Sequence, residues 1–266
     1  MKEQNADPVT RLGLRTRSIL DGVRAMTIFT GRFLFAAGAG VRRPRRLQLK
    51  EILFQLQRAG ADAMVLLACI SFLMGFVIGI QAMATMSPFG AEARIARVVT
   101  IITMQEMGPL LTAILLAGRS GTAFVTTLGT MKLGGEIAAL QARGIDPVGD
   151  FVLPRVLALI LAGPLLAMIT TTASILGGMV ITLWIPQLFP LGYLHGAVDA
   201  MDAGYFFFGL AKIVVFSGLV GLIGCFQGLR ITGSGAVGKG AASSFVIALS
   251  LIVLIDALFN FIYHIY

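Results

Sequence analysis

Charged residues are scarce in this chain of 266 amino acids. Asp, Glu, Lys and Arg make up only 13% of the sequence, whereas 57% of the residues are hydrophobic and the mean hydropathy is +0.88. A soluble domain of ordinary composition carries about 25% charged residues. This shortage excludes a typical water-soluble globule and indicates a chain that lies in a membrane.

Cysteine and histidine are also rare, and their positions form no recognisable site. The sequence has two cysteines, Cys69 and Cys225, and two histidines, His195 and His264, without a CxxC pair or a Cys/His cluster. A disulfide framework and a zinc site are therefore not supported. The G-x-S-x-G motif of hydrolases is absent as well, so we expect no catalytic, metal-binding or cofactor-binding residue in this chain.

One glycine-rich stretch comes close to a phosphate-binding loop but departs from it at the last position. Residues 233–240 read G-S-G-A-V-G-K-G, in which Gly240 stands where the P-loop requires Ser or Thr. The stretch also follows an expected membrane helix, whereas a P-loop follows a strand. We interpret it as a cytoplasmic turn and expect ATP hydrolysis to take place in a partner subunit.

The few charges are unevenly distributed along the chain. Residues 1–60 contain 12 of the 21 Lys and Arg residues but only four of the 13 acidic ones, whereas residues 61–266 contain nine of each sign. A nucleic-acid-binding domain would spread its basic residues over a folded soluble surface, so we expect no nucleic-acid partner. The division predicts a basic cytoplasmic or interfacial segment at 1–60 and a transmembrane domain at 61–266.

Five hydrophobic stretches predict an all-α integral membrane protein. Crossing the hydrocarbon core takes about 20 helical residues, and residues 63–91 alone contain no charge over 29 residues. The expected spans are residues 63–87, 98–118, 151–184, 205–229 and 243–264. The third stretch is longer than a bilayer requires, so we expect it to begin in the cytosol or to bend at Gly163–Pro164. Division of this stretch into a hairpin gives a six-span alternative.

The positions of the basic residues predict the orientation of these spans. With a cytoplasmic N-terminus, the inner segments carry 18 Lys and Arg residues, whereas the outer segments carry two, Arg94 and Arg97. The positive-inside rule favours this arrangement over its inverse. We therefore expect a cytoplasmic N-terminus and a periplasmic, or equivalent, C-terminus.

Helical periodicity is present within the basic N-terminal segment. The residues that recur at helical spacing are Leu12, Ile19, Val23, Met26, Thr30 and Phe33. This spacing predicts an amphipathic helix in the membrane interface, with its Lys and Arg side chains on anionic headgroups. Two other interpretations stay open: a solvated basic tail, and a signal peptide whose apolar region is Phe33–Val41.

Three charged residues fall well inside the expected spans, away from their ends: Glu106, Lys212 and Asp256. A rise of about 1.5 Å per helical residue places all three in the outer half of the bilayer. Charges at this depth are costly and usually face a partner or a watery cavity. We predict that Lys212 neutralises Glu106 or Asp256, within one subunit or across a dimer. The group is either a polar lining for a substrate with a charged headgroup or a structural ion pair.

Residues 131–143 predict a short amphipathic cytoplasmic helix between the second and third spans. Its two faces carry Leu133, Ile137 and Leu140 on the apolar side and Lys132, Glu136 and Arg143 around the rest. Gly144 suits the position after a helix C-terminus, and Pro147 prevents continuation. Such a helix either contacts a soluble motor domain or rests on the membrane surface.

A series of short motifs runs in a fixed order between about residues 50 and 262. Their defining residues are Glu106, Gly108 and Pro109; Gly118, Arg119 and Gly121; Gly129; Gly144, Asp146 and Pro147; and Pro154 and Arg155. Gln81 in the first span and Lys212 and Gly224–Gly228 in the fourth fit the same series. The series resembles the MlaE/YrbE family of permeases from MCE-associated ABC transporters.

The resemblance implies a permease subunit that is not itself an enzyme. Such a permease forms a homodimer, binds two copies of a cytoplasmic ABC ATPase, and works with a periplasmic MCE-domain protein to move phospholipid or a related amphiphile. It implies the inner membrane of a diderm bacterium, with a plastid inner envelope as the less favoured setting. It assigns ATPase coupling to the helix at 131–143 with Asp146, and it places Gln81 beside the three intramembrane charges as a candidate for the substrate path.

The chain departs from the family pattern at three places. The family usually has Arg where this sequence has Gln105, Glu where it has Thr127, and T-E-Q-I-D where it reads G-G-E-I-A around Gly135. The expected coupling helix therefore carries fewer charges than its counterparts. The departures are consistent with a divergent branch that uses a different ATPase or cargo.

Two other classes of protein are alternatives to a permease subunit. A secondary transporter or channel would use Glu106, Lys212 and Asp256 as an ion path, and it predicts internal repeats, of which the sequence has no convincing example. A membrane scaffold that recruits a soluble partner through its basic segment needs no intramembrane charge, yet three are present.

Overall fold

The computed structural model describes residues 8–42, 49–185 and 188–265, and every regular element in them is a helix. Five helical segments in this part are long and apolar enough to cross a membrane: Leu49–Phe89, Glu92–Leu133, Val148–Leu183, Ala203–Arg230 and Ala236–Tyr263. The prediction of an all-α chain with five spans is confirmed. The six-span alternative is wrong, because α7 (Leu153–Met179) runs as one helix through Pro164.

The second span is one rod assembled from five consecutive helical pieces. They are α3 (Ile95–Ile102), the π-helical turn η4 (Thr103–Met107), α4 (Gly108–Leu116), the π-helical turn η5 (Ala117–Gly121) and α5 (Thr122–Leu133). In η4 the Gly108 N–H bonds to the Thr103 carbonyl, five residues back. Pro109, which has no N–H to donate, follows directly. The rod thus passes through a π-turn just before Gly108–Pro109, and the helix continues past the predicted residue 118 to Leu133.

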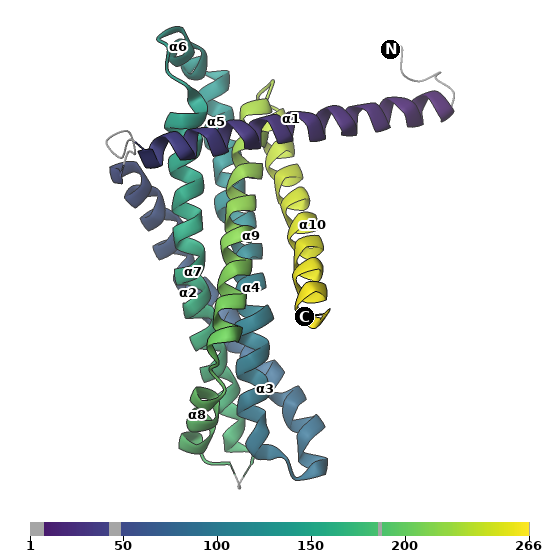
Figure 1. The fold of residues 1–266 in the computed structure, drawn as a ribbon, viewed down its shortest axis with the longest axis vertical. Helices are drawn as coiled ribbons and strands as arrows, with labels where there is room; N and C mark the ends of the chain where they lie inside the picture. The colour runs from purple at the N-terminus through teal and green to yellow at the C-terminus, as the bar shows by residue number, and fades with distance from the viewer. Residues whose placement is uncertain (1–7, 43–48, 186–187, 266) are drawn as a thin grey trace.

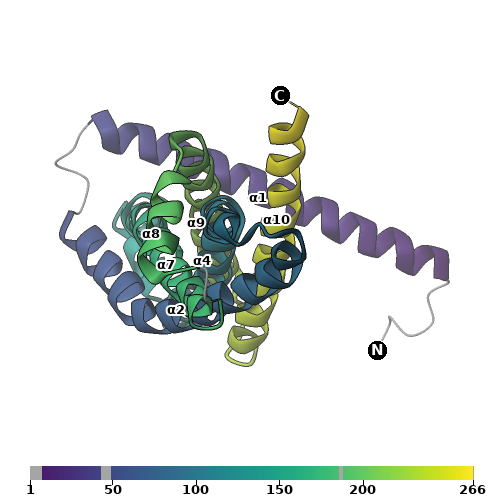
Figure 2. The same ribbon diagram turned by 90° about the horizontal axis from the view of Figure 1, so that it is seen from below.

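The remaining spans pack around α7 and α9 (Ala203–Arg230), as Figures 1 and 2 show. α2 (Leu49–Met86) packs along α7, and α9 contacts α7, α5 and α4. α10 (Ala236–Ile265) lies at the edge of the bundle against α9 and α5. α2 begins upstream of the predicted residue 63, so the expected boundary at residues 60 and 61 lies inside this helix.

The contact between α2 and α7 depends on two glycines that bring the backbones together. A Cβ atom on Gly75 would overlap with the Ser174 carbonyl, and one on Gly177 would overlap with the Phe72 carbonyl. Ser174 adds a hydrogen bond from its hydroxyl to the Ser71 carbonyl at 2.8 Å. Small residues at such crossings are typical of membrane helices, which gain their association energy from close packing.

The N-terminal helix α1 (Pro8–Arg42) crosses one end of the bundle nearly at right angles to the spans (Figures 1 and 2). Among the side chains of α1 that the structure describes, Phe29 and Phe33 are buried, and the Phe29 ring lies 5.4 Å from that of Phe226. Val23 of the predicted apolar stripe is 59% exposed, whereas Met26 and Thr30 are half-buried. The side chains of Leu12 and Ile19 lie outside the described part of the chain.

The opposite end of the bundle is closed by short helices. They are η2 (Ser87–Phe89), η3 (Glu92–Arg94), η7 (Val180–Leu183) and α8 (Pro190–Asp199). Tyr193 of α8 is fully buried there against Gly178, and burial raises the pKa of its phenol, so the hydroxyl stays protonated. The buried residues around Tyr193 anchor the segment between the third and fourth spans.

Candidate functional site

The three charged residues of the spans meet in one cluster, although they come from three different spans. Lys212 of α9 is fully buried, and its Nζ lies 2.7 Å from Glu106 Oε1 in η4 and 2.9 Å from Asp256 Oδ1 in α10. The lysine thus pairs with both carboxylates that the sequence offered as alternatives, and it does so within one subunit.

A fourth residue, Asn260, completes the cluster. Lys212 Nζ donates to Asn260 Oδ1 at 2.8 Å, and Asn260 Nδ2 donates to Glu106 Oε2 at 3.2 Å and to Asp256 Oδ2 at 3.4 Å. An ammonium group has three donors, and here it faces three oxygen acceptors. The Phe208 ring adds a cation–π contact at 4.8 Å. Lys212 is therefore fully provided with partners inside the spans.

The cluster carries an excess of negative charge. With all three groups ionised, two carboxylates oppose one ammonium, while the Glu106 and Asp256 side chains are 27% and 16% exposed. The lysine is therefore enclosed and the carboxylates are partly open. Ionisable groups are costly in a membrane, so this cluster is a candidate for a substrate path as well as for a structural ion pair.

Sequence reasoning missed Asn260, although a signal was present. Asn260 follows Asp256 by four residues in α10, which is the spacing that places two side chains on one face of a helix. Asn is also uncommon at membrane depth because its amide must find partners there. What the pattern could not show is that this face turns toward Lys212.

Gln81 is a candidate that the structure does not bring to the cluster. Its side chain is exposed on α2, and the cluster's hydrogen bonds and ion pairs between described residues do not include it. Gln105, which departs from the family pattern, lies beside Glu106 in η4 and has a buried Nε2 without a hydrogen-bond partner. It marks a second polar position at the same π-turn.

Apolar surfaces adjoin the cluster. A groove of about 710 Å³ between α9 and α10 is lined by Phe208, Leu258, Phe259, Ile262 and Tyr263. Phe208 belongs to both features, since the same ring contacts Lys212 and lines the groove. A charged group and a long apolar surface thus lie side by side, which is the pattern that an amphiphile presents.

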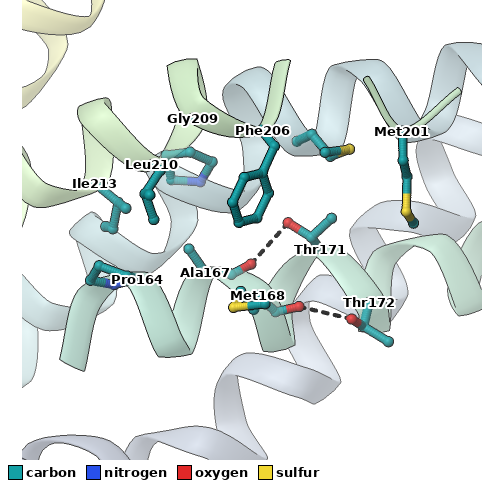
Figure 3. A pocket seen from close by; sticks show the side chains of 12 residues that line it. Pro164, Ala167, Met168, Thr171, Thr172, Met201, Phe206, Gly209, Leu210 and Ile213 are labelled. Carbon is teal, nitrogen blue, oxygen red and sulfur yellow. Dashed lines mark hydrogen bonds between the residues drawn. The ribbon is translucent and has the colours of Figure 1, made fainter. Parts of the chain in front are cut away.

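Figure 3 shows a second apolar cavity, of about 160 Å³, between α4, α7 and α9. Its lining includes Pro164, Met168, Phe206 and Leu210. The hydroxyls of the lining residues Thr171 and Thr172 donate to carbonyls of their own helix at 2.8 and 2.9 Å, so they need no partner in the cavity. The cavity is suited to hydrocarbon rather than to a polar group.

The expected helix at 131–143 is two pieces, and the prediction of one continuous helix is wrong. α5 ends at Leu133, and α6 (Glu136–Ala142) begins after a turn at Gly134–Gly135, where Gly135 has φ of 76°. Two adjacent glycines permit this reversal at low cost. α6 projects from the end of the bundle that α1 crosses (Figure 1).

The candidate coupling residues have different environments in this arrangement. Leu133, Glu136, Arg143 and Asp146 are exposed, Leu140 is half-buried and Ile137 is buried. Lys132 is half-buried, and its Nζ donates to the Leu229 carbonyl at 2.7 Å, which joins this end of the second span to α9. Asp146 accepts hydrogen bonds at 3.3 Å from the N–H groups of Val148 and Gly149 and so caps the third span.

The other motif residues lie at helix junctions and close helix contacts. Gly108 and Pro109 begin α4, and Pro154 and Arg155 lie at the start of α7. Gly118, Arg119 and Gly121 belong to η5, and Gly129 faces Ile231. Gly144 (φ 79°) and Pro147 lie at the end of the loop that follows α6. Their shared property is therefore backbone geometry and packing, with the two arginines as the exceptions.

Five apolar spans with a charged cluster inside them define a multi-pass membrane protein. Comparison with known families then assigns it: residues 52–262 match the family described as Permease MlaE. The chain belongs to this family. Members are permease subunits of ABC transporters and lack ATPase activity, so the motor is a separate subunit.

Individual relatives agree with this assignment. The chain is 31% identical over 246 residues to a probable ABC transporter permease protein of Rickettsia felis, covering 92% of this chain and 93% of the relative. It is 27% identical over 207 residues to the chloroplastic protein trigalactosyldiacylglycerol 1 of Arabidopsis thaliana, covering 78% and 59%. It is 27% identical over 166 residues to the intermembrane phospholipid transport system permease protein MlaE of Haemophilus influenzae, covering 62% of each.

Proposed function

We propose that this permease moves phospholipid, or a related amphiphile, between the inner membrane and a periplasmic MCE-domain carrier. The observation that supports it most directly is the junction of the charged cluster with the α9–α10 groove at Phe208. A cationic group of the headgroup would contact the partly exposed carboxylates, and an acyl chain would lie along the apolar groove. The similarity to a phospholipid transport permease favours the same class of cargo.

The proposed assembly is a homodimer of this chain with two ATPase subunits on the cytoplasmic side. α6 is the element proposed to contact the ATPase, because it projects from the bundle and presents Glu136 and Arg143 to solvent. The same end carries α1, which we propose lies in the membrane interface. Substrate release is proposed at the opposite end, where the MCE-domain protein would dock.

Transport by the reconstituted complex of permease, ATPase and MCE-domain protein tests the proposal. Lys212→Met leaves two carboxylates facing each other without their cation, a type of change that costs about 3–5 kcal/mol. The triple variant Lys212→Met, Glu106→Gln, Asp256→Asn removes all three charges and should regain much of that stability. We expect it to melt near the wild-type temperature and to transport fluorescent phospholipid at less than a tenth of the wild-type rate.

The result separates a substrate path from a structural ion pair. If the neutral triple variant both folds and transports lipid as the wild type does, the cluster is only structural and its proposed role is wrong. Co-purification gives an independent test of the assembly, because the permease should retain a stoichiometric ATPase. Failure to recover an ATPase under mild solubilisation would contradict the proposed complex.

A further inference from the structure

A polar cavity lies far from the charged cluster, at the end of the bundle that α1 crosses. It has a volume of about 400 Å³ and is enclosed by α2, η5 with α5, and α7. One arginine from each of these walls lines it: Arg58 from α2, Arg119 from η5 and Arg155 from α7. Arg119 lies 13 residues after Glu106 on the same rod, or about 20 Å along a helix.

The described lining of this cavity carries a net positive charge. Three guanidinium groups face one carboxylate, Glu51, whose Oε1 already accepts a hydrogen bond from Gln55 Nε2 at 2.8 Å. The lining thus offers cationic donors in excess of anionic acceptors.

Arg155 is the most buried of the three arginines. It is only 6% exposed, and it contacts the Phe151 carbonyl at 2.8 Å and the Phe151 ring at 5.8 Å from the centroid. Neither partner neutralises its charge. Removing an ion from water costs several kcal/mol unless an opposite charge compensates it, so an anion bound beside this side chain would be stabilising.

The geometry points to a phosphate group as that anion, carried by an anionic lipid of the cytoplasmic leaflet. Guanidinium forks match phosphate oxygens in a bidentate manner, and Ser120 and Gln55 add polar groups to the same lining. Arg119 is 21 residues past Val98, or about 31 Å along the helix, which places the cavity at the level of the headgroups. Basic pockets between membrane helices at this level bind anionic headgroups in other proteins.

This site is distinct from the proposed transport path and does not depend on it. The cluster around Lys212 has excess negative charge and the arginine cavity has excess positive charge, so they select different ligands. A lipid held here would bridge the first, second and third spans.

Lipid binding to the full-length purified chain tests the inference. Native mass spectrometry would compare dioleoyl phosphatidylglycerol, which is anionic, with dioleoyl phosphatidylcholine, which is neutral overall. The variants are Arg155→Gln and the exposed Arg58→Gln, which should fold even if the buried position does not tolerate change. Arg94→Gln, an exposed arginine at the opposite end, is the matched control.

We expect the wild type and Arg94→Gln to bind phosphatidylglycerol about tenfold more tightly than phosphatidylcholine, and each cavity variant to lose most of that preference. An undiminished preference in a folded Arg58→Gln and Arg155→Gln pair would overturn the site. An excess of inorganic phosphate should leave the lipid bound. Displacement by phosphate would overturn the lipid assignment and give the cavity to a free phosphate-bearing anion.

Discussion

At the scale of single residues, Lys212 illustrates how a buried charge is accommodated inside a helical bundle. Its ammonium has one partner from η4 and two from α10, and the Phe208 ring covers another side. The sequence predicted which charges would meet, because Glu106, Lys212 and Asp256 are the charged residues far from the ends of the predicted spans. It did not predict Asn260, because the hydrogen bonds of this amide depend on which side chains of the neighbouring helices lie opposite it.

Asn260→Leu tests how much the Asn260 amide contributes to the stability of the cluster. The change leaves one ammonium donor and one oxygen of each carboxylate without a protein partner, at an expected cost of about 1–3 kcal/mol. The apparent Tm of the detergent-purified protein should fall. Ser250→Ala on the same helix, whose exposed hydroxyl bonds only to the Val246 carbonyl, is the control and should leave the Tm nearly unchanged. Equal melting temperatures for both variants would contradict the role of Asn260.

At the scale of elements, the second span is the unit that connects the functional regions. Its π-turns carry Glu106 in the charged cluster and Arg119 in the arginine cavity, and its end leads into α6. π-turns insert an extra residue and often mark functional sites. Hydropathy predicted this span but not the turns, since they depend on the Pro109 backbone and on packing against α7 and α9.

Gly135→Ala tests the turn that separates α5 from α6. The residue has φ of 76°, where an L-residue costs roughly 1–2 kcal/mol, and a Cβ atom there would meet no neighbour. The strain should therefore act on the direction of α6 rather than on the bundle. We expect an unchanged Tm for the spans and reduced permease-dependent stimulation of the ATPase.

The matched control for this change is Gly233→Ala, in the loop before α10. That glycine has no positive φ, and a Cβ atom there meets nothing within 4 Å. Wild-type ATPase stimulation in Gly135→Ala would show that the orientation of α6 does not matter for coupling.

At the scale of the whole molecule, the two ends of the bundle differ in a way that predicts its orientation. One end carries α1, α6 and the arginine cavity, and the other carries α8 and the buried Tyr193. The positive-inside rule predicts that the first end faces the cytoplasm.

Cysteine labelling checks this orientation directly. In a background without Cys69 and Cys225, a membrane-impermeant maleimide should label Met201→Cys, between α8 and α9, in intact cells. It should label Ser234→Cys, between α9 and α10, only after permeabilisation. The reverse pattern would invert the proposed topology.

Hydropathy and charge along the chain were sufficient to predict an all-helical membrane protein with five spans, and the ordered motifs were sufficient to predict its family. These features depend on how each segment interacts with water and lipid, which requires no knowledge of a distant partner. The Asn260 contacts and the gathering of Arg58, Arg119 and Arg155 were decided by the packed bundle. Both depend on which side of a helix faces its neighbour, and that is set by packing between segments far apart in the chain.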